Sequence, residues 1–178
     1  ATAGTLLMDA ARLGADRLFL LADRAFAGSD TFATAKILRR ALEVTGPYDL
    51  ILCGERAIDG ETGQVPGELS AMLGLPFLPC GIRLELKDDV LRCRSLQEDG
   101  TQTLEAGLPA VVSISCGMTG ITHPLMPSLR SLRKAREIGL TVLDSRALGF
   151  RPEEIGQSGS LTRVQKTFSP TLTRTCRF

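Results

Sequence analysis

The sequence lacks the features that define several large classes of protein. It contains no run of 18 apolar residues, so no membrane-spanning helix is expected. Its 21 basic side chains offset 20 acidic ones, and this balance gives no reason to expect nucleic-acid binding. The five cysteines form no CxxC pair, and none stands at ligand spacing from the single histidine, which argues against a zinc site. Scattered thiols of this kind are typical of a reducing, cytoplasmic compartment.

Residues for self-contained catalysis are also scarce. His123 stands beside Pro124, without a serine or cysteine in a strained turn nearby, and is a poor basis for a catalytic triad. Asp59 and Glu61 could act as a carboxylate pair or bind magnesium, but two carboxylates on a loop are more often simply solvated. We therefore predict no catalytic residue and no metal ligand. Any redox chemistry would have to come from a bound cofactor.

What the sequence does contain is an alternation of helical and strand patterns. Apolar spacing predicts an α/β fold with a mostly parallel sheet and helices on both faces, of the Rossmann-like type that binds adenine nucleotides. Alternation and turn residues between 82 and 115 predict an added antiparallel meander. From Arg151 onward the chain is polar and lacks periodicity, which predicts an extended tail. The expected division is an α/β domain at 1–150 and a tail at 151–178 that packs on a partner subunit.

Individual elements can be placed from the same patterns. Helices are expected at residues 6–13, 32–44, 68–73 and 128–138, and strands at 15–23, 49–53, 109–115 and 140–143.

The most distinctive stretch is a glycine-rich loop, GERAIDGETGQVPGE, at residues 54–68. Its glycines let the backbone approach a ligand, and Thr62 is predicted to cap the following helix, whose positive end favours a phosphate. Gln64 could donate to a phosphate or a base. The spacing matches neither GxGxxG nor the lysine-bearing P-loop. A phosphate gripped by backbone amides therefore fits the pattern, and so does an ordinary turn with a helix cap.

Several segments, in order along nearly the whole chain, resemble the β subunit of electron transfer flavoprotein. The glycine-rich loop is similar to the nucleotide loop of that family. The other matching segments are ARLGADR at 11–17, LEAGLPAVVSIS at 104–115, PSLRSLRKAR at 127–136 and SLTRVQKTFSP at 160–170.

This resemblance implies an electron carrier subunit rather than an enzyme acting alone. A β subunit of this family pairs with an α subunit that carries FAD, and it binds AMP itself, or a second FAD in the electron-bifurcating branch. Residues 23–31, DRAFAGSDT, are more similar to the two-flavin branch. The implied partners are the α subunit and a dehydrogenase, in the bacterial cytoplasm, and Leu129 is the implied partner-binding residue. The implied nucleotide site consists of Gly54, Ala57, Ile58, Asp59, Gly60, Glu61, Thr62, Gly63, Gln64 and Val65.

The chain also departs from the family pattern. The family's first strand and its early nucleotide contacts would lie before Ala1, so we expect residues upstream of this sequence. Pro66 and Gly67 stand in reversed order, and THPLMPSL at 122–129 lacks the usual glutamate and arginine. The alternative function is a free-standing adenine-nucleotide-binding module of the universal-stress type. A polar tail of nearly thirty residues favours the heterodimer, because a monomeric module has little use for it.

Overall fold

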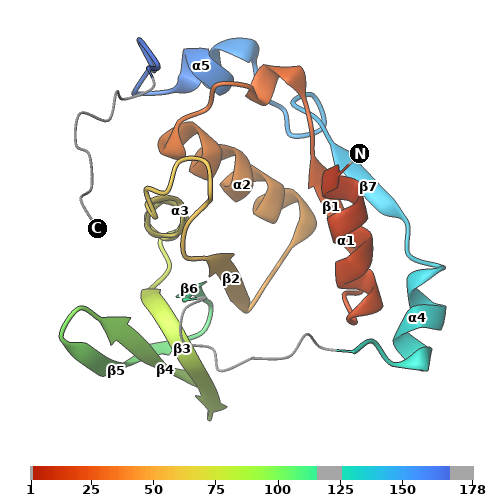
Figure 1. Cartoon of the computed structure of the whole chain (residues 1–178), viewed down its shortest axis with the longest axis vertical. Helices are drawn as coiled ribbons and strands as arrows, with labels where there is room; N and C mark the ends of the chain where they lie inside the picture. The colour runs from red at the N-terminus through yellow and green to blue at the C-terminus, as the bar shows by residue number, and fades with distance from the viewer. Residues whose placement is uncertain (1, 116–125, 169–178) are drawn as a thin grey trace, which may run out of the picture.

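The computed structural model describes residues 2–115 and 126–168 (Figure 1). Seven strands and five α-helices are found within these ranges, together with two short 3₁₀ turns, η1 (Arg24–Phe26) and η2 (Pro152–Glu154). The histidine at 123 and the cysteines at 116 and 176 lie outside the described residues. No helix in the described ranges is long and apolar enough to cross a membrane.

The larger sheet contains five strands in the order β2-β6-β3-β4-β5. β2 and β3 both pair in parallel with β6, whereas the β3–β4 and β4–β5 pairs are antiparallel. The predicted meander is therefore confirmed, with turns at Asp88-Asp89 and Glu98-Asp99. The strands are β2 (Leu50–Gly54), β3 (Phe77–Lys87), β4 (Val90–Gln97), β5 (Gly100–Gly107) and β6 (Ala110–Ile114). Their inward side chains form a core of Leu78, Leu91, Cys93, Ala110 and Val112.

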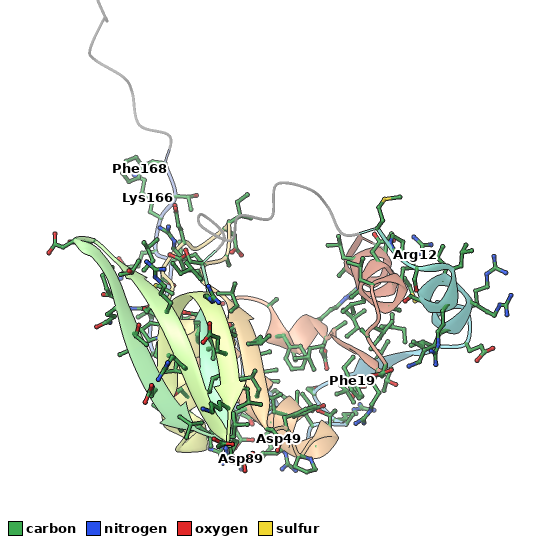
Figure 2. All side chains as sticks on the ribbon, turned by 90° about the horizontal axis from the view of Figure 1, so that it is seen from below. Arg12, Phe19, Asp49, Asp89, Lys166 and Phe168 are labelled. Carbon is green, nitrogen blue, oxygen red and sulfur yellow. The ribbon has the colours of Figure 1, made fainter. Side chains whose placement is uncertain are left out.

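A second, two-stranded parallel sheet joins β1 (Leu18–Leu21) to β7 (Leu140–Leu143). The helices α1 (Thr2–Arg12) and α4 (Leu129–Ala135) pack beside it, around the buried side chains Ala11, Leu18 and Ala135. Arg12 and Phe19 mark this part of the molecule in Figure 2, on the opposite side from the meander.

The sequence predicted one mostly parallel sheet, but the strands form two separate sheets. β1 and β2 belong to different sheets: β1 pairs with β7, and β2 pairs with β6. Apolar runs identify buried strands but carry no information about which strand lies next to which, because pairing is decided by contacts between distant parts of the chain. The coarser prediction, a mixed α/β fold, is confirmed.

Helices α2 (Thr31–Thr45) and α3 (Val65–Leu73) pack against each other, and α3 also covers β6. Asp30 caps α2, since its Oδ1 accepts a hydrogen bond from the N–H of Ala33 at 2.9 Å. The helix ends before Gly46 and Pro47, as the sequence predicts. Gly74 ends α3 in the left-handed conformation, with φ at 67°.

The segment after β7 folds back on the domain before it becomes extended. It forms η2 (Pro152–Glu154) and α5 (Gly156–Gly159), and Ile155 between them is 1% exposed. The sequence predicted extended chain from Arg151, but the described extended stretch begins at Leu161 and runs to Phe168. Lys166 and Phe168 project away from the large sheet in Figure 2. Ile155 is the only large apolar residue in the folded part at 152–160. Its burial depends on contacts with distant parts of the chain, so local periodicity could not predict it.

Candidate functional site

The glycine-rich loop follows the carboxyl end of β2, the edge strand of the larger sheet (Figure 1). Ligands of open α/β sheets bind at such ends, in the crevice outside the strands. Gly54 is the last residue of β2, and Val65 is the first residue of α3. Every residue between Arg56 and Gln64 is exposed, and the Ile58 side chain lies fully in solvent. The predicted site residues therefore form one continuous, open loop.

The helix cap differs from the predicted one. The N-cap position of α3 is occupied by Gln64 rather than Thr62, and no side chain caps this helix. Thr62 lies two residues too early to reach the first helical N–H groups. Within the described ranges, the backbone N–H groups of Thr62, Gly63 and Gln64 make no hydrogen bond. These donors are available to an anion, and the first turn of α3 adds only the N–H groups of Val65 and Gly67, because Pro66 has none.

The acidic character of the loop is offset by Arg56, whose role the sequence analysis missed. Its Nε lies 3.5 Å from Glu55 Oε1, and its Nη1 lies 3.6 Å from Glu61 Oε1. Asp59 is engaged locally, because its Oδ1 accepts a hydrogen bond from the N–H of Gly60 at 2.8 Å. A phosphate near the loop would therefore meet partly neutralised carboxylates. Arginine one position after a glutamate is the signal in the sequence that could have indicated this pairing.

A second loop, residues 23–30, comes close to the first through the start of α2. The hydroxyl of Thr31 lies 3.3 Å from Gln64 Oε1 and 3.0 Å from Glu68 Oε1. The other oxygen, Glu68 Oε2, is buried and has no hydrogen-bond partner among the described residues. The structure thus brings together two of the segments that carry the family resemblance, and it adds Glu68, which the sequence analysis did not select.

An adenine nucleotide fits these residues on three counts. A Cβ added at Gly54 or Gly60 would meet no heavy atom within 4 Å, so open space lies against the backbone there. The unpaired N–H groups at 62–64 can donate to phosphate oxygens. Glu68 Oε2 lacks the donor that a buried carboxylate oxygen needs, and a ribose hydroxyl or an amino group could supply it. The loop would hold the nucleotide, and a bound flavin would add the redox chemistry.

A cavity of about 530 Å³ is lined in part by residues of the loop. Cys80 lies at its wall, on a bulge of β3, and adopts a left-handed backbone conformation with φ at 50°. Burial and the nearby carboxylate of Glu55 raise the pKa of the Cys80 thiol, so the thiol stays protonated at neutral pH. The other lining residues are Glu55, Arg56, Gly63, Phe77, Pro79, Leu96, Gln97, Glu98 and Ser113.

The predicted partner-binding residue lies far from the loop, at the start of α4. The Leu129 side chain is 87% exposed, and Met126 just before it is 88% exposed. Ser128 caps the helix instead, accepting a hydrogen bond from the N–H of Ser131 at 3.0 Å. Leu129 therefore does not anchor the helix in the core. Among the described residues no cluster of three or more potential metal ligands occurs.

Comparison with known proteins assigns these features to a family. Residues 1–135 match the electron transfer flavoprotein domain. The chain is 32% identical over 171 residues to the electron transfer flavoprotein subunit beta of Megasphaera elsdenii, covering 93% of this chain and 62% of that protein. The corresponding subunit of Thermoanaerobacterium thermosaccharolyticum is 34% identical over 171 residues, covering 94% and 64%.

A third relative is named as part of a reductase complex. It is the caffeyl-CoA reductase-Etf complex subunit CarD of Acetobacterium woodii, 32% identical over 168 residues, covering 94% of this chain and 63% of that protein. The chain thus spans somewhat less than two thirds of the length of the relatives it matches. The match over residues 1–135 shows that the chain belongs to the electron transfer flavoprotein family, and the relatives that it matches are named as β subunits of that family or as part of a reductase complex.

Proposed function

We propose that this protein is the β subunit of a heterodimeric electron transfer flavoprotein. With an α subunit that carries the main FAD, it passes electrons between a dehydrogenase and an acceptor. The observation that carries the proposal is the agreement between the family match over residues 1–135 and the open loop at the end of β2. The alternative, a free-standing nucleotide-binding module of the universal-stress type, would account neither for the electron transfer flavoprotein relatives nor for the projecting tail.

The β-subunit pocket is proposed to hold AMP or a second FAD. Free N–H groups at 62–64, the open backbone at Gly60 and the unpaired oxygen of Glu68 support an adenine nucleotide in general. The resemblance of residues 23–31 to the two-flavin branch favours FAD. Relatives named for caffeyl-CoA and acryloyl-CoA reductases point to a reductase or dehydrogenase of acyl-CoA compounds as the partner.

Nucleotide content distinguishes the two forms of the proposal. The chain should be purified alone and after co-expression with its α subunit, and bound nucleotides should be released and quantified beside an ultraviolet–visible spectrum. If the pocket holds AMP, we expect little flavin on the isolated chain and one FAD per heterodimer together with AMP. Two FAD per heterodimer would instead establish the two-flavin form. A chain that forms no complex with the α subunit and retains no nucleotide would refute the proposal.

Two substitutions in the loop test the nucleotide site itself. Gly60→Val places bulk where the ligand's phosphate would approach, although the free protein has room for it, because no heavy atom lies within 4 Å of an added Cβ. Gln64→Ala removes a hydrogen bond worth about 0.5–1.5 kcal/mol, which weakens AMP binding by about two- to tenfold. Binding should be measured by isothermal titration calorimetry, with thermal unfolding as the control for folding.

The control for both variants is Gly107→Val, at the end of β5 and remote from the loop. It also adds bulk in open space and should leave AMP affinity unchanged. If the Gly60 and Gln64 variants bind AMP as tightly as the control does, the loop is not the nucleotide site.

A further inference from the structure

The first residues after α5 are fastened to the N-cap of α2. The Oδ2 atom of Asp30 accepts hydrogen bonds from the N–H and the hydroxyl of Thr162, at 2.8 and 3.1 Å. In return, the N–H of Asp30 donates to Ser160 Oγ at 2.9 Å. The hydroxyl of Ser160 lies 2.7 Å from the carbonyl oxygen of Gly156, which closes the turn at the end of α5. The exposed chain that continues to Phe168 therefore starts from a fixed point.

The Asp30 side chain at this fixed point is held in its charged form. Burial acts to raise the pKa of Asp30, but the hydrogen bonds from the N–H groups of Ala33 and Thr162 outweigh it, so the pKa lies below its usual value. The carboxylate is charged at neutral pH and uses its two oxygens for two tasks: Oδ1 caps α2, and Oδ2 holds Thr162. Charge-assisted hydrogen bonds of this kind are stronger than neutral ones.

The residue next to Asp30 contacts the nucleotide loop. Thr31 has a single hydroxyl proton and two acceptors within reach, Gln64 Oε1 at 3.3 Å and Glu68 Oε1 at 3.0 Å. A ligand that bound Gln64 or donated to the free oxygen of Glu68 would alter the competition between these two acceptors for that proton. Because Thr31 is the first residue of α2, its position is linked through the backbone to Asp30. Only two adjacent residues separate the loop from the C-terminal segment.

We propose that Thr31 is a positioning residue of the nucleotide loop, and that Asp30 beside it couples nucleotide binding to the ordering of residues 160–168. The inference rests on the proposed nucleotide site and adds a second property to it. A filled loop would hold Thr31, and thereby Asp30 and Thr162, in the arrangement seen here. The exposed segment that follows, with Leu161, Val164 and Phe168 each at least 75% exposed, would then leave the domain in a fixed direction toward a partner.

The coupling is reciprocal by thermodynamic necessity. If AMP holds the segment closed by a given factor, then AMP binds the closed form more tightly than the open form by that factor, and opening the segment must weaken AMP binding by up to that factor. This requirement separates a coupling role from a merely structural one, because a structural defect would lower stability without linking the two measurements.

The test measures amide hydrogen exchange of residues 160–168 by mass spectrometry, with and without saturating AMP, the portion that both candidate nucleotides share. In the full-length wild-type chain we expect AMP to slow exchange at least fivefold, the lower end of typical coupling. Thr31→Val, which keeps the shape but loses the hydroxyl, should abolish this slowing, and Thr31→Ser should restore it. Residues 140–150, which include β7, serve as the internal control and should not respond to AMP.

The reverse arm uses the double variant Ser160→Ala/Thr162→Val, which removes the two hydroxyls that attach the segment. Its AMP dissociation constant should rise, by at most the factor by which AMP slows exchange in the wild type, because the N–H of Thr162 can still donate to Asp30. Unchanged exchange in wild-type protein that calorimetry shows to be saturated with AMP would overturn the coupling and leave the nucleotide site intact. Slowing that persists in Thr31→Val would overturn the role of Thr31. A failure of AMP to bind at all would refute the nucleotide site and the coupling together.

Discussion

Gly156→Ala should destabilise the protein by about 3 kcal/mol or more. Gly156 has φ at 61°, a conformation that costs a residue with a Cβ about 1–2 kcal/mol. An added Cβ would also lie only 2.2 Å from the carbonyl oxygen of Ala25 and 3.0 Å from that of Ala27. Both contacts are with backbone atoms, so no side-chain rotation can relieve them, and overpacking of this kind typically costs a further 1–3 kcal/mol. Urea denaturation monitored by circular dichroism measures the loss.

Gly149→Ala is the matched control for this substitution. Gly149 also has a positive φ, 73°, but an added Cβ there would meet only the Nη2 atom of Arg40, at 3.9 Å. The control isolates the conformational cost from the steric one and should lose about 1–2 kcal/mol. Equal losses in the two variants would show that α5 does not press against residues 24–28 as described. A larger loss at Gly156 would establish that the start of the C-terminal segment is part of the fold.

The folding of the segment around Gly156 could not be predicted from the sequence. Residues 152–160 contain glycine, glutamine and serine, a composition that resembles a linker. Their folding depends on Ile155, which enters the cluster formed by Ile37, Ala41, Leu143 and Leu148. Ile37 and Ala41 come from α2, and Leu143 comes from β7; all three lie more than ten positions from Ile155 in the sequence. Only Leu148 is nearer in the sequence. No local pattern in the sequence records such a contact.

Elements with strong local signals were predicted well. The strand at 140–143 has the predicted ends, and the helix predicted at 32–44 corresponds to α2, which runs from Thr31 to Thr45. The meander followed from alternation and from turn residues, two of which, Asp88 and Asp89, adopt positive φ. Strand order did not follow, because the β1–β7 pair joins residues about 120 positions apart.

The candidate site divides in the same way. The loop was found from its glycines and from resemblance, both of which are local properties of the sequence. Arg56 as a partner of Glu55 and Glu61, and Thr31 as a partner of Gln64, required the geometry. The carboxylate of Asp23 is another group whose partners could not be found from the local sequence. Hydrogen bonds from the N–H groups of Ala25 and Ser145 and from the Ser145 hydroxyl lower the pKa of Asp23 to about 2, and Ser145 is distant in the sequence.

Leu129→Ala should slow electron transfer to the proposed partner dehydrogenase by about tenfold while leaving the fold intact. The Leu129 side chain is 87% exposed and Met126 is 88% exposed, so both offer apolar surface to a partner. Arg130, Arg133 and Arg136, in α4 and at its C-cap, are also exposed. An apolar anchor with a charged rim is the anatomy of a docking site, where removing a central side chain commonly costs more than 1 kcal/mol of binding. A loss of 1.4 kcal/mol corresponds to a tenfold lower kcat/KM.

Stability provides the discriminating measurement for this substitution. A leucine that stapled α4 into the core would lose about 2–5 kcal/mol on truncation, whereas an exposed one should change the unfolding free energy by less than about 0.5 kcal/mol. Leu132, three residues later in the same helix and partly buried, is the matched control. Leu132→Ala should lower stability more than Leu129→Ala and affect kcat/KM less. A destabilised Leu129→Ala variant with unchanged kcat/KM would refute the docking role, because the side chain would then serve the fold and not the partner.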